Sequence, residues 1–210
     1  MEILQRIAQE LELGEVDSVG SLTREAITAG LAPKEILDRG LIAGMNVVGD
    51  KFREHEIFLP DVLMAAKAMY AGMDELKPLL VRDGTPSRGK IVIGTVQGDL
   101  HDIGKNLVAI MLRGAGFEVI DLGNDVAPAR FVAAAKDSGA SLIGMSALLT
   151  TTMTAMRKVT ALLAEEGLMG KIRTIIGGAP VSAEYAREIG ADAYAYDAAN
   201  AIQRVKEMIG

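Results

Sequence analysis

The second half of the sequence alternates between short apolar runs and longer stretches with helical periodicity. Runs with the length and β-branched content of buried strands are expected at 90–96, 117–121, 141–146, 172–177 and 191–195. Amphipathic helices are expected at 103–115, 128–138, 152–166, 181–189 and 198–209. Strands that alternate with helices predict a doubly wound parallel sheet, and five of them favour the flavodoxin-like or Rossmann-like arrangement.

One loop of this predicted sheet holds an unusual set of residues. From Gly94 to Gly104 it reads Gly-Thr-Val-Gln-Gly-Asp-Leu-His-Asp-Ile-Gly. His101 therefore stands just beyond the carboxyl end of the first strand, where open α/β sheets bind ligands. Asp99 stands two positions before it, so its carboxylate could accept the second ring N–H of a metal-ligating histidine. The loop is thus a candidate for metal ligation by His101.

A lone histidine near a helix start is often only a polar surface residue. Phosphate binding and zinc binding by this loop both fit the sequence poorly. Gly98 and Gly104 are separated by five residues, not by the four of a phosphate-binding loop, and the acidic residues between them would repel a phosphate. Zinc needs three or four nitrogen or sulfur ligands, but the sequence has no cysteine and only His55 besides His101. A metal held by one histidine must bring its other ligands with it, as a macrocycle does.

The segment from Gly98 to Gly104 resembles the D-x-H-x-x-G signature of cobalamin-binding domains. Two more segments match the same family in order: Ser146-Ala147-Leu148 resembles its S-x-L segment, and Gly177-Gly178 resembles its G-G segment. The whole chain resembles the corrinoid proteins of anaerobic methyltransferase systems, and it is similar to the cobalamin-binding module of methionine synthase. The resemblance implies a cobalamin or cobamide cofactor, with its lower base displaced and His101 as the lower axial ligand of cobalt.

Hydroxyl residues follow the third predicted strand. Ser and Thr near a helix start are usually caps, which explains one hydroxyl better than the run of them seen here. In the family, a hydroxyl at the position of Thr152 completes a relay with the aspartate and histidine, where methionine synthase has serine. The resemblance also implies that Ser146 and Thr150 contact the nucleotide tail of the cofactor.

The remaining residues implied by the resemblance lie in the last third of the chain. Gly177 and Gly178 could simply form a turn after the fourth strand, but in the family they allow close approach of the backbone to the nucleotide tail. Ala198 falls where the family has a small residue near the corrin periphery. In this half, the residues expected to bind the cofactor are Gly98, Asp99, His101, Asp102, Ile103, Gly104, Ser146, Leu148, Thr150, Thr152, Gly177, Gly178 and Ala198.

The first part of the chain has a different pattern. Four amphipathic stretches with short connections predict an antiparallel four-helix bundle. A polar segment rich in Gly, Pro and Ser follows, as in a linker. We therefore expect a helical-bundle cap domain, a linker about which the two halves can move, and a cobalamin-binding α/β domain, at 1–82, 83–89 and 90–210.

The segment between the third and fourth helical stretches breaks the amphipathic pattern. Core packing could explain its apolar residues. In the methionine synthase module, however, residues at positions matching Phe52, Leu59 and Val62 form an apolar cap over the upper face of the corrin. Such a cap would shield a cobalt-bound methyl group from water. His55 lies among charged neighbours and is expected to face solvent.

Composition excludes several other classes of protein. The net charge of -6 argues against a basic surface that binds nucleic acid. No run approaches the roughly 20 apolar residues of a membrane-spanning helix. Charged residues such as Glu2 and Arg6 interrupt any secretory signal, and the absence of cysteine fits a reducing compartment. We expect a cytoplasmic protein with neither nucleic-acid nor membrane partners.

The resemblance implies that the chain is a methyl-carrying subunit without catalytic residues of its own. Its cofactor would alternate between cob(I)amide and methylcob(III)amide. A substrate-specific methyltransferase would load the methyl group, a corrinoid:tetrahydrofolate or coenzyme M methyltransferase would unload it, and a reductive activator protein is a third expected partner. The protein would supply ligation, orientation and shielding. Methanol, methylamines, methoxyaromatics and betaines all remain open as methyl donors.

Three other functions fit the sequence less well than that of a methyl carrier. Cobalamin-sensing regulators pair such modules with a DNA-binding domain, but this sequence has no basic helix-turn-helix. Cobalamin mutase subunits resemble only residues 90–210 and are not expected to have the helical cap. A response-regulator-like receiver needs an aspartate after the third strand, where Ser146 stands. A cobalamin-sensing regulatory protein is the main alternative function.

Overall fold

The structure, a computed structural model, describes residues 2–82 and 87–209 and divides the chain into a helical unit and an α/β unit that begins at Ser87. Most of the expected linker, residues 83–86, lies outside the described residues. In the described part of the chain, no helix is both long and apolar enough to cross a membrane.

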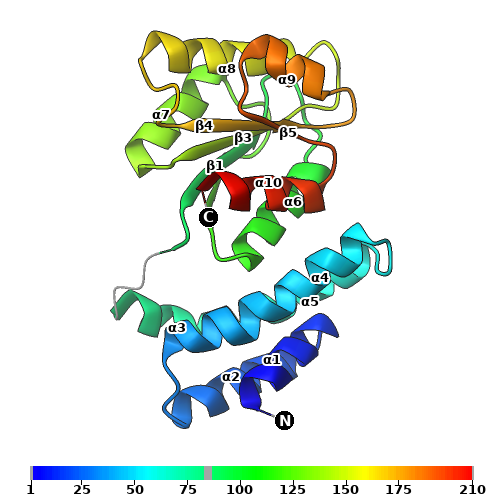
Figure 1. Cartoon of the computed structure of the whole chain (residues 1–210), viewed down its shortest axis with the longest axis vertical. Coiled ribbons are helices and arrows are strands. Elements are labelled where there is room, and N and C mark those ends of the chain that lie inside the picture. The colour runs from blue at the N-terminus through cyan, green and yellow to red at the C-terminus, as the bar shows by residue number, and fades with distance from the viewer. Residues whose placement is uncertain (1, 83–86, 210) are drawn as a thin grey trace. The chain divides into compact units, whose positions relative to one another are not determined.

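The N-terminal unit is a bundle in which apolar stripes face inward. On its first helix the buried residues Leu4, Ile7 and Leu11 recur every three to four positions, which places them on one face. The bundle is shown in Figure 1. Its elements are α1 (Ile3–Glu12), α2 (Val16–Thr28), the continuous run of α3 (Pro33–Ile36), η1 (Leu37–Ile42) and α4 (Ala43–Arg53), and α5 (Leu59–Arg82).

The third helix of the bundle contains a π-helical segment, η1, which periodicity alone did not predict. Two glycines in and just after this segment allow α1 to approach closely. A Cβ at Gly40 would lie 3.1 Å from the side chain of Ile7, and one at Gly44 would lie 2.7 Å from the carbonyl oxygen of Ala8. Close packing against α1 therefore accounts for both glycines within the bundle itself.

The C-terminal unit is a five-stranded parallel sheet in the order β2-β1-β3-β4-β5. This confirms the predicted doubly wound, flavodoxin-like arrangement. The elements, in chain order, are β1 (Lys90–Thr95), α6 (Ile103–Gly114), β2 (Glu118–Asp121), α7 (Pro128–Ser138), β3 (Leu142–Ser146), α8 (Thr154–Glu165), β4 (Arg173–Gly177), α9 (Ala183–Ile189), β5 (Ala193–Ala195) and α10 (Ala198–Ile209).

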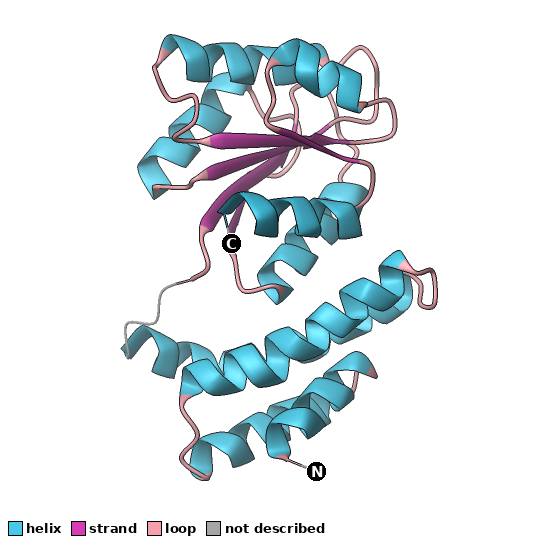
Figure 2. Ribbon diagram, in the orientation of Figure 1, coloured by secondary structure: helices cyan, strands magenta, loops and turns pink. Residues whose placement is uncertain are grey.

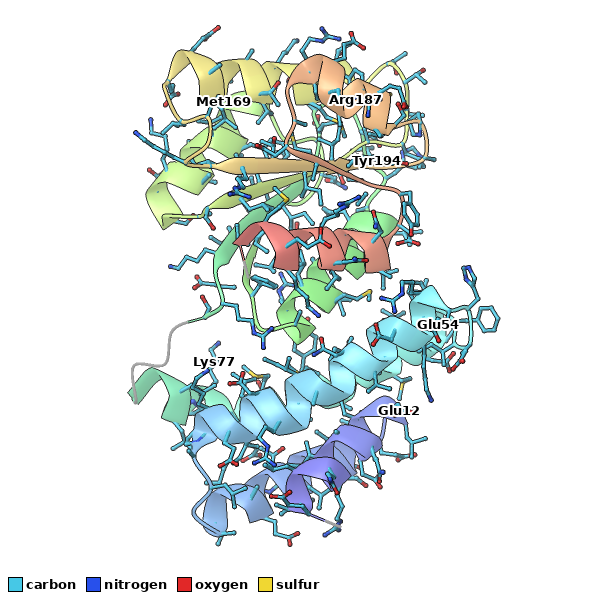
Figure 3. All side chains as sticks on the ribbon, viewed as in Figure 1. Glu12, Glu54, Lys77, Met169, Arg187 and Tyr194 are labelled. Atoms are coloured by element: carbon cyan, nitrogen blue, oxygen red, sulfur yellow. The ribbon has the colours of Figure 1, made fainter. Side chains whose placement is uncertain are left out.

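Helices cover both faces of the sheet, with α7, α8 and α9 on one face and α6 and α10 on the other (Figures 1 and 2). A hydrophobic core cluster lies on the first face, where Val92, Ile143 and Ile176 of the strands pack with Phe131 of α7 and Val159 of α8. Charged side chains such as Arg187 of α9 extend into solvent (Figure 3). The sheet is therefore held rigidly from both sides, which fixes where its strand-end loops lie.

We predict that Phe131→Ala lowers the free energy of unfolding by about 3–5 kcal/mol, because it leaves a cavity where a completely buried ring packs against the sheet. Urea denaturation of the two proteins measures the difference. Met169→Ala, at an exposed site labelled in Figure 3, is the control and should change the value by less than about 0.5 kcal/mol. Similar losses in both variants would contradict the assigned core.

Candidate functional site

Three loops meet at the carboxyl edge of the sheet because their strands are neighbours. The last residues of β1, β3 and β4 stand in one row, since Thr95 pairs with Ser146 and Ser146 pairs with Gly177. The loops that follow these strands contain the histidine, the hydroxyl residues and the two glycines of the predicted site. The strand order therefore brings these three sequence segments to one edge, as the alternation of strands and helices predicted.

His101 and Asp99 form a direct pair in the first of these loops. The ring Nδ1 of His101 lies 2.7 Å from Oδ1 of Asp99, and the backbone N–H of His101 donates to the same oxygen at 3.0 Å. Asp99 is completely buried, whereas the His101 side chain is 53% exposed. An ionised carboxylate can only accept, so the Nδ1 of His101 carries the proton and the lone pair of Nε2 is left for a ligand.

The second oxygen of Asp99 is held by the loop that follows β3. The Leu148 backbone N–H donates to Oδ2 at 2.7 Å, and the Leu149 N–H lies at 3.3 Å. The Thr152 hydroxyl lies 2.9 Å from Oδ2 and 2.8 Å from the carbonyl oxygen of Leu149. Its single proton is drawn to the ionised carboxylate, the stronger acceptor. Thr152, Asp99 and His101 thus form a continuous chain of hydrogen bonds.

This environment keeps the Asp99 carboxyl ionised. Burial acts to raise its pKa, but donors from the Leu148 and His101 backbone, the His101 ring and the Thr152 hydroxyl together hold the pKa well below its usual range. The hydroxyl of Thr152 also does not cap α8, which begins at Thr154 without a side-chain cap. Thr152 therefore contributes to the aspartate site and not to the helix start.

The other expected contact residues have mixed surroundings. Ser146 ends β3 half-buried and Thr150 is exposed. Gly178 has a φ of 128°, and a Cβ there would lie 1.9 Å from the carbonyl oxygen of Ala147. A Cβ at Gly177 would lie 2.9 Å from the carbonyl oxygen of Ala195. The fold itself therefore requires both glycines, whatever they do for a ligand.

Gly104, in the first turn of α6, has no such internal reason. Its backbone has no left-handed φ, and a Cβ built on it would meet no atom of the described residues within 4 Å. Large apolar side chains are exposed on the segments around this edge, including Leu100, Ile103 and Tyr196, which are 69%, 73% and 65% exposed. Open space beside a half-exposed histidine, with apolar side chains nearby, suits a flat macrocycle such as a corrin.

Ala198 opens α10 and is itself buried. The expected cap residues lie in the helical unit, around the connection between α4 and α5. Phe52 and Leu59 are half-buried, whereas Val62 is completely buried. His55 is exposed, as predicted, and has a left-handed φ of 61°.

Several residues that support the site were not predicted from the sequence. The ammonium of Lys105 is buried and lies 2.7 Å from both carboxylate oxygens of Asp121, which ties the start of α6 to the end of β2. Thr95, Asn124 and Asp125 hydrogen-bond the backbone of the His101 loop. The Asn-Asp pair after β2 is a turn signal in the sequence. Its contact with the first loop depends on tertiary structure.

Among the described residues, no group of three or more His, Cys, Asp or Glu side chains could hold a metal ion.

Comparisons with known proteins agree along the whole chain. A B12 binding domain matches residues 89–206, and a second B12 binding domain matches residues 3–77. The dimethylamine corrinoid protein of Methanosarcina barkeri is 46% identical over 99% of this chain and 98% of its own length. Trimethylamine corrinoid protein 2 of Methanosarcina acetivorans is 42% identical over 99% of this chain and 97% of its own length.

Solved structures give the same result. A chain in the methanol:cobalamin methyltransferase complex of Methanosarcina barkeri matches with a TM-score of 0.89 and 34% identity, covering 99% of this chain and 79% of that chain. A cobalamin-binding protein of Desulfitobacterium hafniense matches with a TM-score of 0.81 and 33% identity, covering 99% of this chain and 98% of that chain.

We predict that Asp99 makes the stability of the cofactor-free protein depend on acid pH. Because folding lowers its pKa, its stabilising effect is complete above the unfolded value of about 3.9 and is lost as the pH falls from there towards the folded value. The difference in free energy of unfolding between the unsubstituted protein and Asp99→Asn should therefore shrink below about pH 4. Urea denaturation between pH 6 and pH 3 measures this difference.

Asp137→Asn, which removes an exposed carboxylate on α7, is the matched control. It should not reproduce the acid-dependent change. A difference between the unsubstituted protein and Asp99→Asn that stays constant down to pH 3 would show that Asp99 is not held ionised.

Proposed function

The chain belongs to the family of corrinoid proteins with B12-binding domains, and from that premise we propose that it carries a methyl group between two methyltransferases. The cofactor of this family is a corrinoid, so the chain binds cobalamin or a related cobamide with its cobalt. The observation that most supports a ligand role for His101 is its ring, half exposed and fixed by a buried, ionised Asp99 at the edge of the sheet.

The residues of the α/β unit fit this cofactor. His101 would ligate cobalt through Nε2, because Nδ1 is engaged by Asp99. Gly104 leaves room beside it, and exposed apolar side chains such as Ile103 would contact the corrin face. The bound corrinoid supplies a cobalt centre that accepts and releases methyl groups. The remaining expected contacts, Ser146, Thr150 and Ala198 among them, stay part of this proposal.

Asp99 and Thr152 would tune the site without touching the cofactor. Asp99 holds the His101 ring in one tautomer and one orientation, and its negative charge makes Nε2 a stronger donor to a metal. Thr152 and the Leu148 N–H keep that negative charge in place. The relay would therefore control how strongly the Nε2 of His101 donates to the cobalt of a bound corrinoid.

We propose that Phe52 and Leu59 provide apolar cover for the carried methyl group. Both side chains are half-buried, so each keeps apolar surface available for a ligand. Val62 is completely buried and would act by supporting the start of α5. Exclusion of water is the physical reason for such cover.

The proposed partners follow from the relatives. One relative in a solved structure is part of a methanol:cobalamin methyltransferase complex, which supports a substrate-specific methyltransferase as the partner that loads the methyl group. Relatives named for dimethylamine and trimethylamine favour a methylamine as the methyl donor. A methyltransferase that uses tetrahydrofolate or coenzyme M would unload the carrier, and a reductive activator would restore it after oxidation.

We predict that His101→Ala changes the absorption and electron paramagnetic resonance spectra of the corrinoid-loaded protein from histidine-ligated to base-on or water-ligated. Loss of the lower ligand should also weaken corrinoid binding. His55→Ala removes the other histidine, which is exposed in the helical unit, and should leave both spectra unchanged. Unchanged spectra in His101→Ala would exclude the ligand role.

We also predict that the reduced, corrinoid-loaded protein is methylated by a methylamine only when a matching methyltransferase is added. The assay pairs each candidate donor, including methanol and methoxyaromatics, with its own methyltransferase and follows the cofactor by absorption. Methylation with methanol and not with any methylamine would overturn the proposed donor. No methylation by any pair would argue against the carrier function.

A further inference from the structure

The loop between β2 and α7 holds the His101 loop by its backbone. The Gly98 N–H donates to Oδ1 of Asp125 at 2.7 Å, and the Asp125 N–H donates to the carbonyl oxygen of Asp99 at 3.0 Å. Asp125 thereby hydrogen-bonds the backbone of both Gly98 and Asp99, although Asp125 and Gly98 are 27 positions apart in the sequence.

The backbone of Asp125 is unusual. Its φ is 52°, in the left-handed region that few residues other than glycine adopt and that Asp and Asn tolerate best. In this conformation the residue presents its N–H and its carboxylate to the same neighbouring segment. A locally unfavourable backbone that makes two specific contacts beside a binding site is a reason to ask what those contacts do.

We propose that Asp125 is a positioning residue that sets the orientation of Asp99 and, through it, the tautomer and direction of the His101 ring. The functional importance of this positioning rests on the proposed ligation of cobalt by His101. The positioning itself is a property of the protein without cofactor. Nothing in Asp125 itself has to touch the corrinoid.

The segment that Asp125 holds needs external support. Gly98 is exposed and has a φ of 85°, so its backbone is free to take many conformations. The next residue is Asp99, whose Oδ1 must lie within hydrogen-bond distance of the His101 ring. The Asp99 N–H donates to the carbonyl oxygen of Val96 at 3.1 Å, so Asp125 holds the peptide one step earlier, between Gln97 and Gly98. Without the Asp125 acceptor that earlier peptide is free to rotate, which shifts Asp99 relative to the ring.

Other contacts hold the rest of the loop. The buried Thr95 hydroxyl donates to the carbonyl oxygen of His101 at 2.9 Å, and Nδ2 of Asn124 lies 3.4 Å from the carbonyl oxygen of Leu100. Asp125 is the side chain that holds the start of the loop, at Gly98, while the following N–H, that of Asp99, donates to the carbonyl oxygen of Val96. Its removal should therefore affect Asp99 more than the loop as a whole.

Two substitutions separate the hydrogen bond from the backbone conformation. Asp125→Asn keeps an acceptor oxygen and tolerates a left-handed φ, whereas Asp125→Gly keeps the conformation but has no acceptor. Asp137→Asn on α7 controls for the loss of one exposed negative charge. The readout is the ratio of the Nδ1–H to the Nε2–H tautomer of His101, from ring ¹⁵N chemical shifts of the cofactor-free protein at alkaline pH. His55, the other histidine, is an internal reference.

We expect the Nδ1–H tautomer to dominate in the unsubstituted protein, in Asp125→Asn and in Asp137→Asn. Asp125→Gly should lower the tautomer ratio about threefold or more, while the His55 signals stay unchanged. An unchanged ratio in Asp125→Gly, or an equal fall in Asp125→Asn, would overturn the proposal.

Hydrogen exchange of the Gly98 N–H tests the same contact without any substitution. We expect exchange slower than that of an unstructured chain by on the order of 10-fold, and exchange without protection would overturn the proposal. The tautomer ratio and the hydrogen exchange are both measured without the cofactor, so their results are independent of the His101→Ala spectra. A tautomer response with unchanged spectra in His101→Ala would mean that Asp125 positions the ring but that the ring is not the cobalt ligand.

Discussion

The negative charge of Asp99 lies in the interior of the α/β unit, and the surrounding structure is arranged to compensate it. An isolated buried carboxylate would cost several kcal/mol or would become protonated. Here one oxygen accepts from His101 and the other accepts from Leu148 and Thr152. These donors come from two loops that are far apart in the sequence. The charge can exist only because β1 and β3 are neighbours in the sheet.

The need for donors to the Asp99 carboxylate links the strand order of the sheet to the hydrogen bonds at its carboxyl edge. In a parallel sheet all strands end at the same side, so backbone N–H groups that follow adjacent strands can converge on one carboxylate. Covering helices on both faces keep the strands in register. Gly177 and Gly178 serve the same end, because side chains there would collide with Ala195 and Ala147. A sequence motif can thus mark a ligand site and still be required by the fold.

Much of this arrangement could be predicted from the sequence. Strand and helix periodicity predicted the order of the sheet, because each element is long enough to show its pattern. The pairing of Asp99 with His101 followed from their separation by one residue. By contrast, periodicity did not predict the π-helical segment η1, nor the contacts of Asp125 with Gly98 and of Lys105 with Asp121, which join residues 16 or more positions apart. Periodicity contains no information on such contacts, because they depend on which strand ends and loops lie side by side in the folded sheet.

The same contacts determine how much the site must change when it binds its cofactor. Binding costs free energy whenever a loop or side chain has to be ordered. In this structure the tautomer and direction of the His101 ring are already set by Asp99, and the loop backbone is held by Thr95 and Asp125. If His101 ligates cobalt as we propose, little of the affinity for a corrinoid is lost to ordering the His101 side chain. Under the proposed ligation, the strength of the bond from Nε2 to cobalt remains adjustable, and this would tune how firmly the cofactor holds the methyl group that a carrier must also release.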